Sequence, residues 1–235
     1  MLLNRLQRHL ENIYEVRSNY QVADFLISDP ALARELDESE TARELPEKLL
    51  IRKQQGEEDV NLGLYLDPEL LRRLEANDPT QNLDGQNLHD FWLAIEGISH
   101  FLYFTWNASF ERRVSLLEME LQGEVDKYIL AAILFYSQQQ GAVPARLHQH
   151  LFQDMAYDAR LNAAELLRYR RANYFAARFC YSLEKLFLRS RAHAPMLNTL
   201  RRFYRLTQHH KISAIERLGK STHLPAGCRL SNFAH

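Results

Sequence analysis

A stripe of polar side chains runs along an otherwise apolar stretch of the chain between residues 88 and 107. If this stretch is a helix, each residue advances ~100°, and five polar residues then fall within about 60° of one another. They are His89, Glu96, His100, Tyr103 and Asn107. Glu96 and His100 stand one helical turn apart, so their side chains can contact each other or share a bound ion.

The following stretch adds carboxylates at Glu118, Glu120 and Glu124. On the same helical projection Glu118 points into the apolar face, whereas Glu120 and Glu124 lie away from its centre. A carboxylate on an apolar face must find a partner or take a raised pKa. If the two helices pack antiparallel, we therefore expect Glu118 to meet Glu96 and His100.

Carboxylate and imidazole groups in this combination suit two kinds of chemistry. They can bind a divalent metal such as Zn, Mn or Fe, and the candidate ligands are then His89, Glu96, His100 and Glu118. Alternatively, Glu96, His100 and Glu118 can form the catalytic acid–base site of a hydrolase-type enzyme without a metal. The chain has no His-Glu-x-x-His motif. The sequence alone therefore favours a plainer interpretation, in which the stripe faces water and Glu96–His100 is a surface pair.

A second feature is a row of cations with tyrosines beside them, on an expected helix over 159–191 and on the helix after it. Such a row can follow a phosphate backbone while the tyrosines stack on bases, which makes RNA or DNA a candidate partner. We call this row the basic face. It consists of Arg171, Tyr174, Arg178, Tyr181, Lys185, Arg189, Arg202 and Arg205.

The charges are divided unevenly along the chain. Residues 160–235 hold 15 Lys and Arg against three acidic residues, a net +12, whereas residues 1–159 hold 14 against 27, a net −13. We expect the basic face to dock on the acidic part, within one chain or between the protomers of a homo-oligomer. An acidic protein partner and nucleic acid are the alternatives, although a sequence pI near 6.8 is low for a dedicated nucleic-acid binder.

Hydrophobic periodicity predicts a mainly α fold, a helical bundle with a small N-terminal β-hairpin. The hairpin is expected to pair residues 48–53 with 60–66, and the Asp-Pro steps at Asp29 and Asp67 predict helix starts. We expect an acidic part over 1–80 and a helical body over 86–235, either as two domains or as one continuous domain. The expected helices cover 1–16, short segments from 30 and 68, then 86–107, 111–138, 145–155, 159–191, 195–211 and 213–219, the last with a capping box of Ser213 and Glu216.

The remaining features of the sequence limit the possible locations and functions of the protein. The most apolar stretch is too short to span a bilayer, Cys180 and Cys228 have no metal-binding spacing, and the N-terminus lacks the apolar core of a secretory signal. We therefore expect a cytoplasmic protein with reduced thiols and no membrane contact. The first hypothesis is an interaction or scaffold protein that acts through its charged faces. The alternatives are the hydrolase-type enzyme, with a divalent metal as its only candidate cofactor, and the RNA- or DNA-binding protein.

Overall fold

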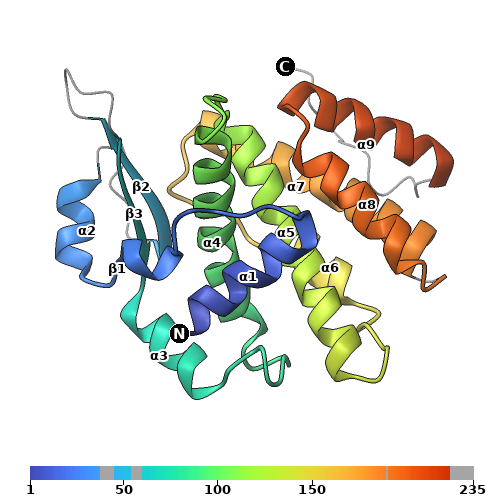
Figure 1. Cartoon of the computed structure of the whole chain (residues 1–235), viewed down its shortest axis with the longest axis horizontal. Coiled ribbons are helices and arrows are strands. Elements are labelled where there is room, and N and C mark those ends of the chain that lie inside the picture. The colour runs from blue at the N-terminus through green and yellow to red at the C-terminus, as the bar shows by residue number, and fades with distance from the viewer. Residues whose placement is uncertain (38–44, 54–59, 189, 223–235) are drawn as a thin grey trace.

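The computed structural model describes residues 1–37, 45–53, 60–188 and 190–222, and it confirms the mainly α fold. A small sheet lies at one end of the molecule, and helices make up the rest (Figure 1). The N-terminal elements are α1 (Leu2–Tyr14), the 3-10 turn η1 (Val22–Phe25), β1 (Leu26–Ile27), α2 (Pro30–Leu36), β2 (Glu47–Lys53), β3 (Val60–Leu66) and α3 (Pro68–Ala76). The later elements are α4 (Leu88–Ala108), α5 (Leu116–Gln138), α6 (Leu147–Phe152), α7 (Ala163–Leu183), the π-helical turn η2 (Glu184–Leu188), α8 (His193–Tyr204) and α9 (Gln208–Thr222).

The sheet contains the expected hairpin and one further strand. β2 and β3 are antiparallel, with Glu47 opposite Leu66 and Leu50 opposite Gly63. β1 pairs with the other edge of β3 in parallel, so the strand order is β1-β3-β2. A strand of two residues is too short to show the alternation that marks a strand in sequence, which is why only the hairpin was predicted.

Both predicted Asp-Pro helix starts are confirmed. The side chain of Asp29 accepts a hydrogen bond from the backbone N–H of Ala31 at 2.8 Å, and Asp67 accepts one from Glu69 at 2.9 Å. In each case the aspartate satisfies an N–H that the first turn leaves without a helical partner.

The core is built around the antiparallel pair of α4 and α5, with α7 on the other side of α5. Phe91, Ile95, Ile98 and Leu102 of α4 are buried, as their spacing predicts. α4 also lies close against the sheet at Gly97, where a Cβ atom would stand 2.8 Å from Cδ1 of Leu64. α5 is buried on all sides from Leu117 to Ala132, so it has no single apolar face.

The C-terminal helices begin and end at other residues than expected. The single helix predicted over 195–211 is wrong, because α8 ends at Tyr204 and α9 begins at Gln208. The predicted capping box at Ser213 is also wrong, since Ser213 lies inside α9. The backbone N–H of Gln208 donates instead to Oε2 of Glu118 at 3.1 Å, a partner from another helix that satisfies the start of α9.

A buried lysine, Lys211, joins α9 to the core. Its side chain is fully buried, its ammonium donates a hydrogen bond to Oε1 of Gln122, and Nζ lies 4.5 Å from the ring centroid of Phe203. Gln122 in turn donates to Asp126 at 2.8 Å. Burial lowers the pKa of Lys211 to about 7, while Glu118 and Asp126 act in the opposite direction. α9 therefore docks through an amine that is partly neutral near pH 7.

Candidate metal centre

Three side chains with metal-binding atoms converge between α4 and α5. They are Glu96 and His100 of α4 and Glu120 of α5, and one ligand atom from each lies within 4.8 Å of the other two. Nε2 of His100 is 3.6 Å from Oε2 of Glu120. The sequence analysis placed Glu96 and His100 together, and the structure does the same.

The imidazole of His100 is held in a closed space. His100 is 7% exposed, and its Nε2 has no hydrogen-bond partner among the described residues. A Cβ atom on Gly123 would lie 3.0 Å from Nε2, so the absence of a side chain at Gly123 leaves the ring its room. Burial lowers the pKa of His100 against the opposing effect of Glu96. The ring is therefore neutral near pH 7, which is the form that binds metals.

Further carboxylates surround these three residues. Lys127 of α5 donates to Oε2 of Glu96 and to Oε1 of Glu124, each at 2.8 Å. Glu47 reaches the same region from β2, where burial and the neighbouring Glu96 raise its pKa well above the ordinary value. Within the described part of the chain, Oε2 of Glu47 and Oε2 of Glu124 have no hydrogen-bond partner.

The electrostatics of the group are dominated by burial. Burial raises the pKa of Glu120 to about 8, and the adjacent Glu96 adds to the effect while Arg168 opposes it. Burial alone would also raise the pKa of Glu96, but the ammonium of Lys127 brings it below the ordinary value. Nε of Arg168, from α7, is 3.6 Å from Oε1 of Glu120. Four carboxyl groups thus share two cationic side chains, and the group has carboxylate oxygens to spare.

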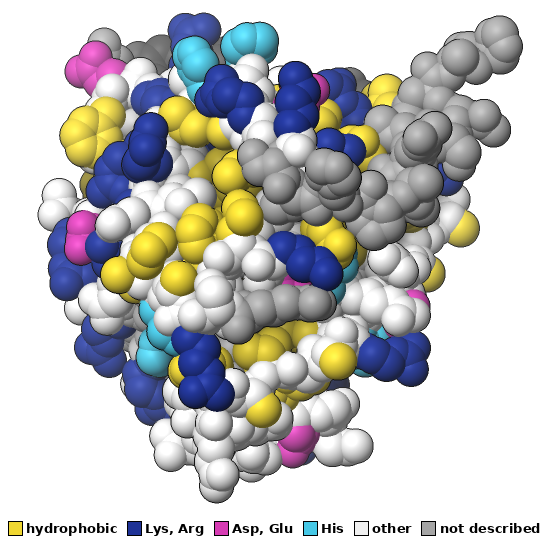
Figure 2. Space-filling view, turned by 90° about the vertical axis from the view of Figure 1, so that its right-hand side faces the viewer, with side chains coloured by type: hydrophobic (Ala, Val, Ile, Leu, Met, Phe, Trp, Pro, Cys, Tyr) yellow, Lys and Arg dark blue, Asp and Glu magenta, His cyan; other side chains and the backbone are white. Residues whose placement is uncertain are grey.

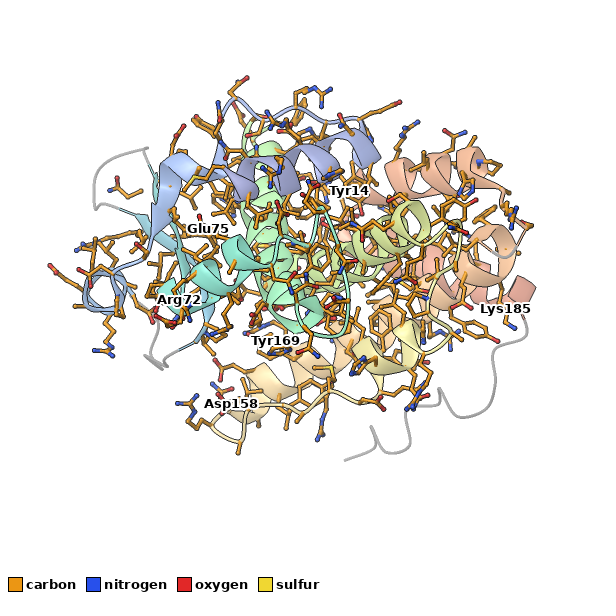
Figure 3. All side chains as sticks on the ribbon, turned by 90° about the horizontal axis from the view of Figure 1, so that it is seen from below. Tyr14, Arg72, Glu75, Asp158, Tyr169 and Lys185 are labelled. Atoms are coloured by element: carbon orange, nitrogen blue, oxygen red, sulfur yellow. The ribbon has the colours of Figure 1, made fainter. Side chains whose placement is uncertain are left out.

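A cleft with a volume of about 180 Å³ lies beside the group. Glu47, Glu96, Glu124 and Lys127 form its polar wall, and Leu93, Met155, Leu161 and two tyrosines form most of the remainder. Figure 3 labels Tyr169 and Asp158 of this cleft, with Lys185 in η2, beyond the opposite end of α7. A small molecule in the cleft could therefore contact Glu96 directly.

Glu118 and His89 are not part of this group, contrary to the expectation for the metal and catalytic sets. Glu118 is buried in the first turn of α5, where it forms an ion pair with Arg112 and accepts a hydrogen bond from Oη of Tyr103 at 2.5 Å. His89 is exposed at the first turn of α4. The expectation that the polar stripe faces water is also wrong, since Tyr103 and Asn107 are completely buried.

Glu120, Glu124 and Lys127 were missed as site residues because a single apolar face was assumed for α5. One sequence signal could have found two of them. Glu120 and Glu124 stand four residues apart, the same spacing as Glu96 and His100, so two facing helices each present a pair one turn apart. Glu47 could not have been found this way, because it comes from a strand.

The basic face is only partly docked on the acidic part of the chain. Arg205 donates to the backbone oxygens of Tyr14 at 2.9 Å and Glu15 at 3.1 Å, at the C-terminal end of α1. Its neighbour Arg201 forms an ion pair with Glu15 at 2.9 Å.

The basic residues on α7 and η2 are different. Arg178 donates to Oη of Tyr174 at 3.0 Å, and Nζ of Lys185 lies 5.4 Å from the ring centroid of Tyr181. Arg171 and Lys185 are exposed. None of the three cations forms an ion pair with a described carboxylate. Arg189 lies outside the described residues.

No helix in the described part of the chain is both long enough and apolar enough to cross a lipid bilayer. Comparisons of the chain with known protein families, with curated proteins and with solved structures give no match.

Proposed function

We propose that this protein binds a divalent metal ion through Glu96, His100 and Glu120, and that the metal serves a hydrolase-type reaction in the adjacent cleft. One observation carries the proposal. The imidazole of His100 is buried without a hydrogen-bond partner, and its free nitrogen faces the carboxylate of Glu120. An imidazole in this state lacks the partner that buried polar groups normally have, and a metal ion would supply it.

The distances agree with this role. Two ligand atoms at ~2.1 Å from a zinc ion in tetrahedral geometry are about 3.4 Å apart. Nε2 of His100 and Oε2 of Glu120 are 3.6 Å apart, close to that value. The ligand atom of Glu96 lies within 4.8 Å of the other two, so a side-chain rotation of Glu96 would complete the set. Such a rotation is available to a glutamate, whose last torsion has broad minima.

The chemistry of the group agrees with this role. Burial raises the pKa of Glu120 to about 8, so a divalent ion would bind by displacing the proton of this carboxyl group. Imidazole with carboxylates suits Zn, Mn and Fe(II). A metal in such a site activates water or polarises a substrate oxygen. Glu47 faces the cleft with an unpartnered oxygen and is placed to hold a proton during the reaction.

The test is metal analysis of the purified protein and of two variants. Wild type is stripped with a chelator and titrated with Zn²⁺, Mn²⁺, Fe²⁺ and Co²⁺ under anaerobic conditions. Glu120→Gln removes a ligand and is expected to weaken binding by about 10-fold or more, in line with the loss seen when metal sites lose supporting groups. Glu118→Gln is the matched control, because it removes a buried carboxylate from the same helix outside the group.

Two results would overturn the metal site: wild type that binds none of the four ions, or Glu120→Gln that binds them as tightly as wild type. The group would then be a buried ion network neutralised by Lys127 and Arg168. Activity is tested separately on chromogenic phosphate and carboxylate esters, with hydrolysis expected only in the metal-loaded wild type. Metal binding without hydrolysis of any ester would support the metal site and contradict the proposed reaction.

A second function is favoured by the state of the basic face. Because Arg171, Arg178 and Lys185 have no ion pair with a described carboxylate, α7 and η2 present cations to a partner. We propose an interaction role for this surface, with an acidic protein or a second copy of the chain as the partner. Backbone oxygens of Tyr14 and Glu15 already satisfy Arg205 of the same face.

Charge reversal of Arg178 and Lys185 tests this second role. We expect the melting temperature to change little, because Lys185 is exposed, Arg178 is only half-buried, and neither forms an ion pair with a described carboxylate. Sedimentation would show whether self-association is lost. RNA that binds wild type, with affinity falling steeply as salt rises, would assign the surface to nucleic acid instead.

A further inference from the structure

A groove between α8 and α9 combines an apolar floor with two arginines. Its volume is about 380 Å³, within the range of small-molecule sites. The spacing of its residues explains why they share one side. On both helices the lining residues stand three or four positions apart, which is one helical turn. α8 contributes Thr199, Arg202 and Phe203, with Leu206 just beyond its end, and α9 contributes Ala214, Arg217 and Leu218.

The floor of the groove is rigid and aromatic. Phe203 stacks on Phe179 of α7 with ring centroids 3.9 Å apart, and both side chains are almost completely buried. Leu206 and Leu218 pack against the same core but stay half-buried. The groove therefore offers apolar surface to an acyl chain or an aromatic ring.

The two arginines stand over this floor, one on each helix. Arg202 and Arg217 are both exposed. Neither guanidinium forms an ion pair or a side-chain hydrogen bond with any residue that the structure describes. On this face, basic and apolar side chains lie side by side and acidic ones are few (Figure 2). Two exposed guanidinium groups without partners among the described residues, one on α8 and one on α9, favour an anion that both can contact.

We propose that the groove binds an amphipathic anion, a molecule with a carboxylate or phosphate head and an apolar tail. The head would lie between Arg202 and Arg217, and the tail would cover Phe203 and the two leucines. This site is separate from the metal centre. It shares Arg202 with the basic face, but it differs from the part of that face on α7 and η2 because it adds an apolar floor, which a bare polyphosphate would leave uncovered.

The same head group could belong to a free molecule or to a lipid in a bilayer. The structure favours the free molecule. No large hydrophobic side chain of the described parts of α8 or α9 is fully exposed, so these helices present no residue to insert into a bilayer. The tail must instead enter the groove.

The probes are dodecanoate and dodecyl phosphate, used below their micelle concentrations on the full chain. Binding is measured by calorimetry and by displacement of anilinonaphthalene sulfonate, an aromatic anion whose fluorescence rises in apolar sites. The double variant Arg202→Gln/Arg217→Gln should bind both anions about tenfold more weakly or worse, since hydrogen bonds to charged groups are lost. The matched control is Arg8→Gln/Arg113→Gln, which removes the same charge from exposed positions outside the groove and the basic face.

Dodecyltrimethylammonium, with the same tail and a cationic head, should bind at least tenfold more weakly than dodecanoate. A second variant, Ala214→Phe, fills the groove without changing its charge and should also weaken binding of both anions. Equal binding of the cationic probe, or full affinity in either groove variant, would overturn the proposal. Binding to anionic vesicles with none to the monomeric probes would overturn it as well, and would assign the arginines to a lipid surface.

Discussion

Replacing Lys211 by Met should stabilise the protein near neutral pH and remove part of the pH dependence of its stability. Methionine has a similar length and an unbranched, apolar side chain that adapts to the space available. In the wild-type protein, the ammonium is enclosed by Phe203 and Tyr103 and has Gln122 as its hydrogen-bond acceptor. It has no carboxylate within ion-pair distance among the described residues.

The magnitude follows from the lowered pKa. The ordinary value is 10.5 and the folded value is about 7. At ~1.4 kcal/mol per unit, burying the charge costs about 5 kcal/mol when the lysine is fully protonated and about 4 kcal/mol at pH 7. Met removes this cost but leaves Oε1 of Gln122 without its donor, a loss of ~1–3 kcal/mol. The expected net gain at pH 7 is therefore about 1–3 kcal/mol.

The sign of the pH dependence is fixed by the direction of the shift. Between about pH 7 and 10.5 the unfolded chain holds a proton on Lys211 that the folded chain has lost. Unfolding then takes up a proton, so the free energy of unfolding rises with pH across this window, by up to ~1.4 kcal/mol per unit. Below pH 7 both states are protonated and the full cost is present. The Met variant should lack this contribution at every pH.

Urea unfolding followed by circular dichroism at several pH values from 6 to 10 measures both effects. Lys220→Met is the matched control, because Lys220 lies on the same helix and is exposed. It should change neither the stability nor its slope. A Lys211→Met variant that is less stable than wild type, with an unchanged slope, would refute the reasoning. It would show that the buried amine stays charged and is stabilised by the surrounding rings.

Three further substitutions test the packing around the candidate site. Ile98→Ala should lower the free energy of unfolding by about 2–5 kcal/mol, because Ile98 is completely buried; a loss under about 1 kcal/mol would mean that the core collapses around the vacancy. Glu118→Ala should lower the free energy of unfolding in urea by about 3 kcal/mol, since it leaves the half-buried Arg112 without its ion pair. A similar loss in Glu118→Gln would show that the hydrogen bond from the N–H of Gln208 contributes little to stability. Gly123→Ala would place its Cβ 3.0 Å from the imidazole of His100, so metal affinity should fall about 10-fold. The ~1 kcal/mol that alanine adds to the stability of the helix should offset the cost of this close contact, so the melting temperature should change little.

Much of the fold was predictable because its signals are local. The Asp-Pro steps at Asp29 and Asp67, the alternation in β3 and the apolar face of α4 all depend on residues within a few positions of each other. The division between α8 and α9 was not predictable for the opposite reason. The partner of the Gln208 N–H is Glu118, which belongs to another helix far away in the sequence.

The candidate site was half predictable. Glu96 and His100 lie on one helix that has a clear apolar surround, so their alignment identified them. The third member was assigned to Glu118 instead of Glu120 because a helical projection ranks residues by their angle from one apolar face. α5 is buried all the way around, so every direction on it is an interior direction and the projection cannot choose between them.

The polar contacts between α4 and α5 also determine which parts of the protein can move. They occur at successive heights along the two antiparallel helices, so a slide of one turn, ~5.4 Å, would separate all of them at once and leave buried groups unpaired. The helix pair therefore has a single register and acts as a fixed frame. Any opening that admits a ligand to the cleft must come from its other walls, which are β2 with Glu47, the segment 155–161 between α6 and α7, and α7 with Tyr169. The pairs are Glu96 with Lys127, Ser99 with Asp126, and Tyr103 with Glu118.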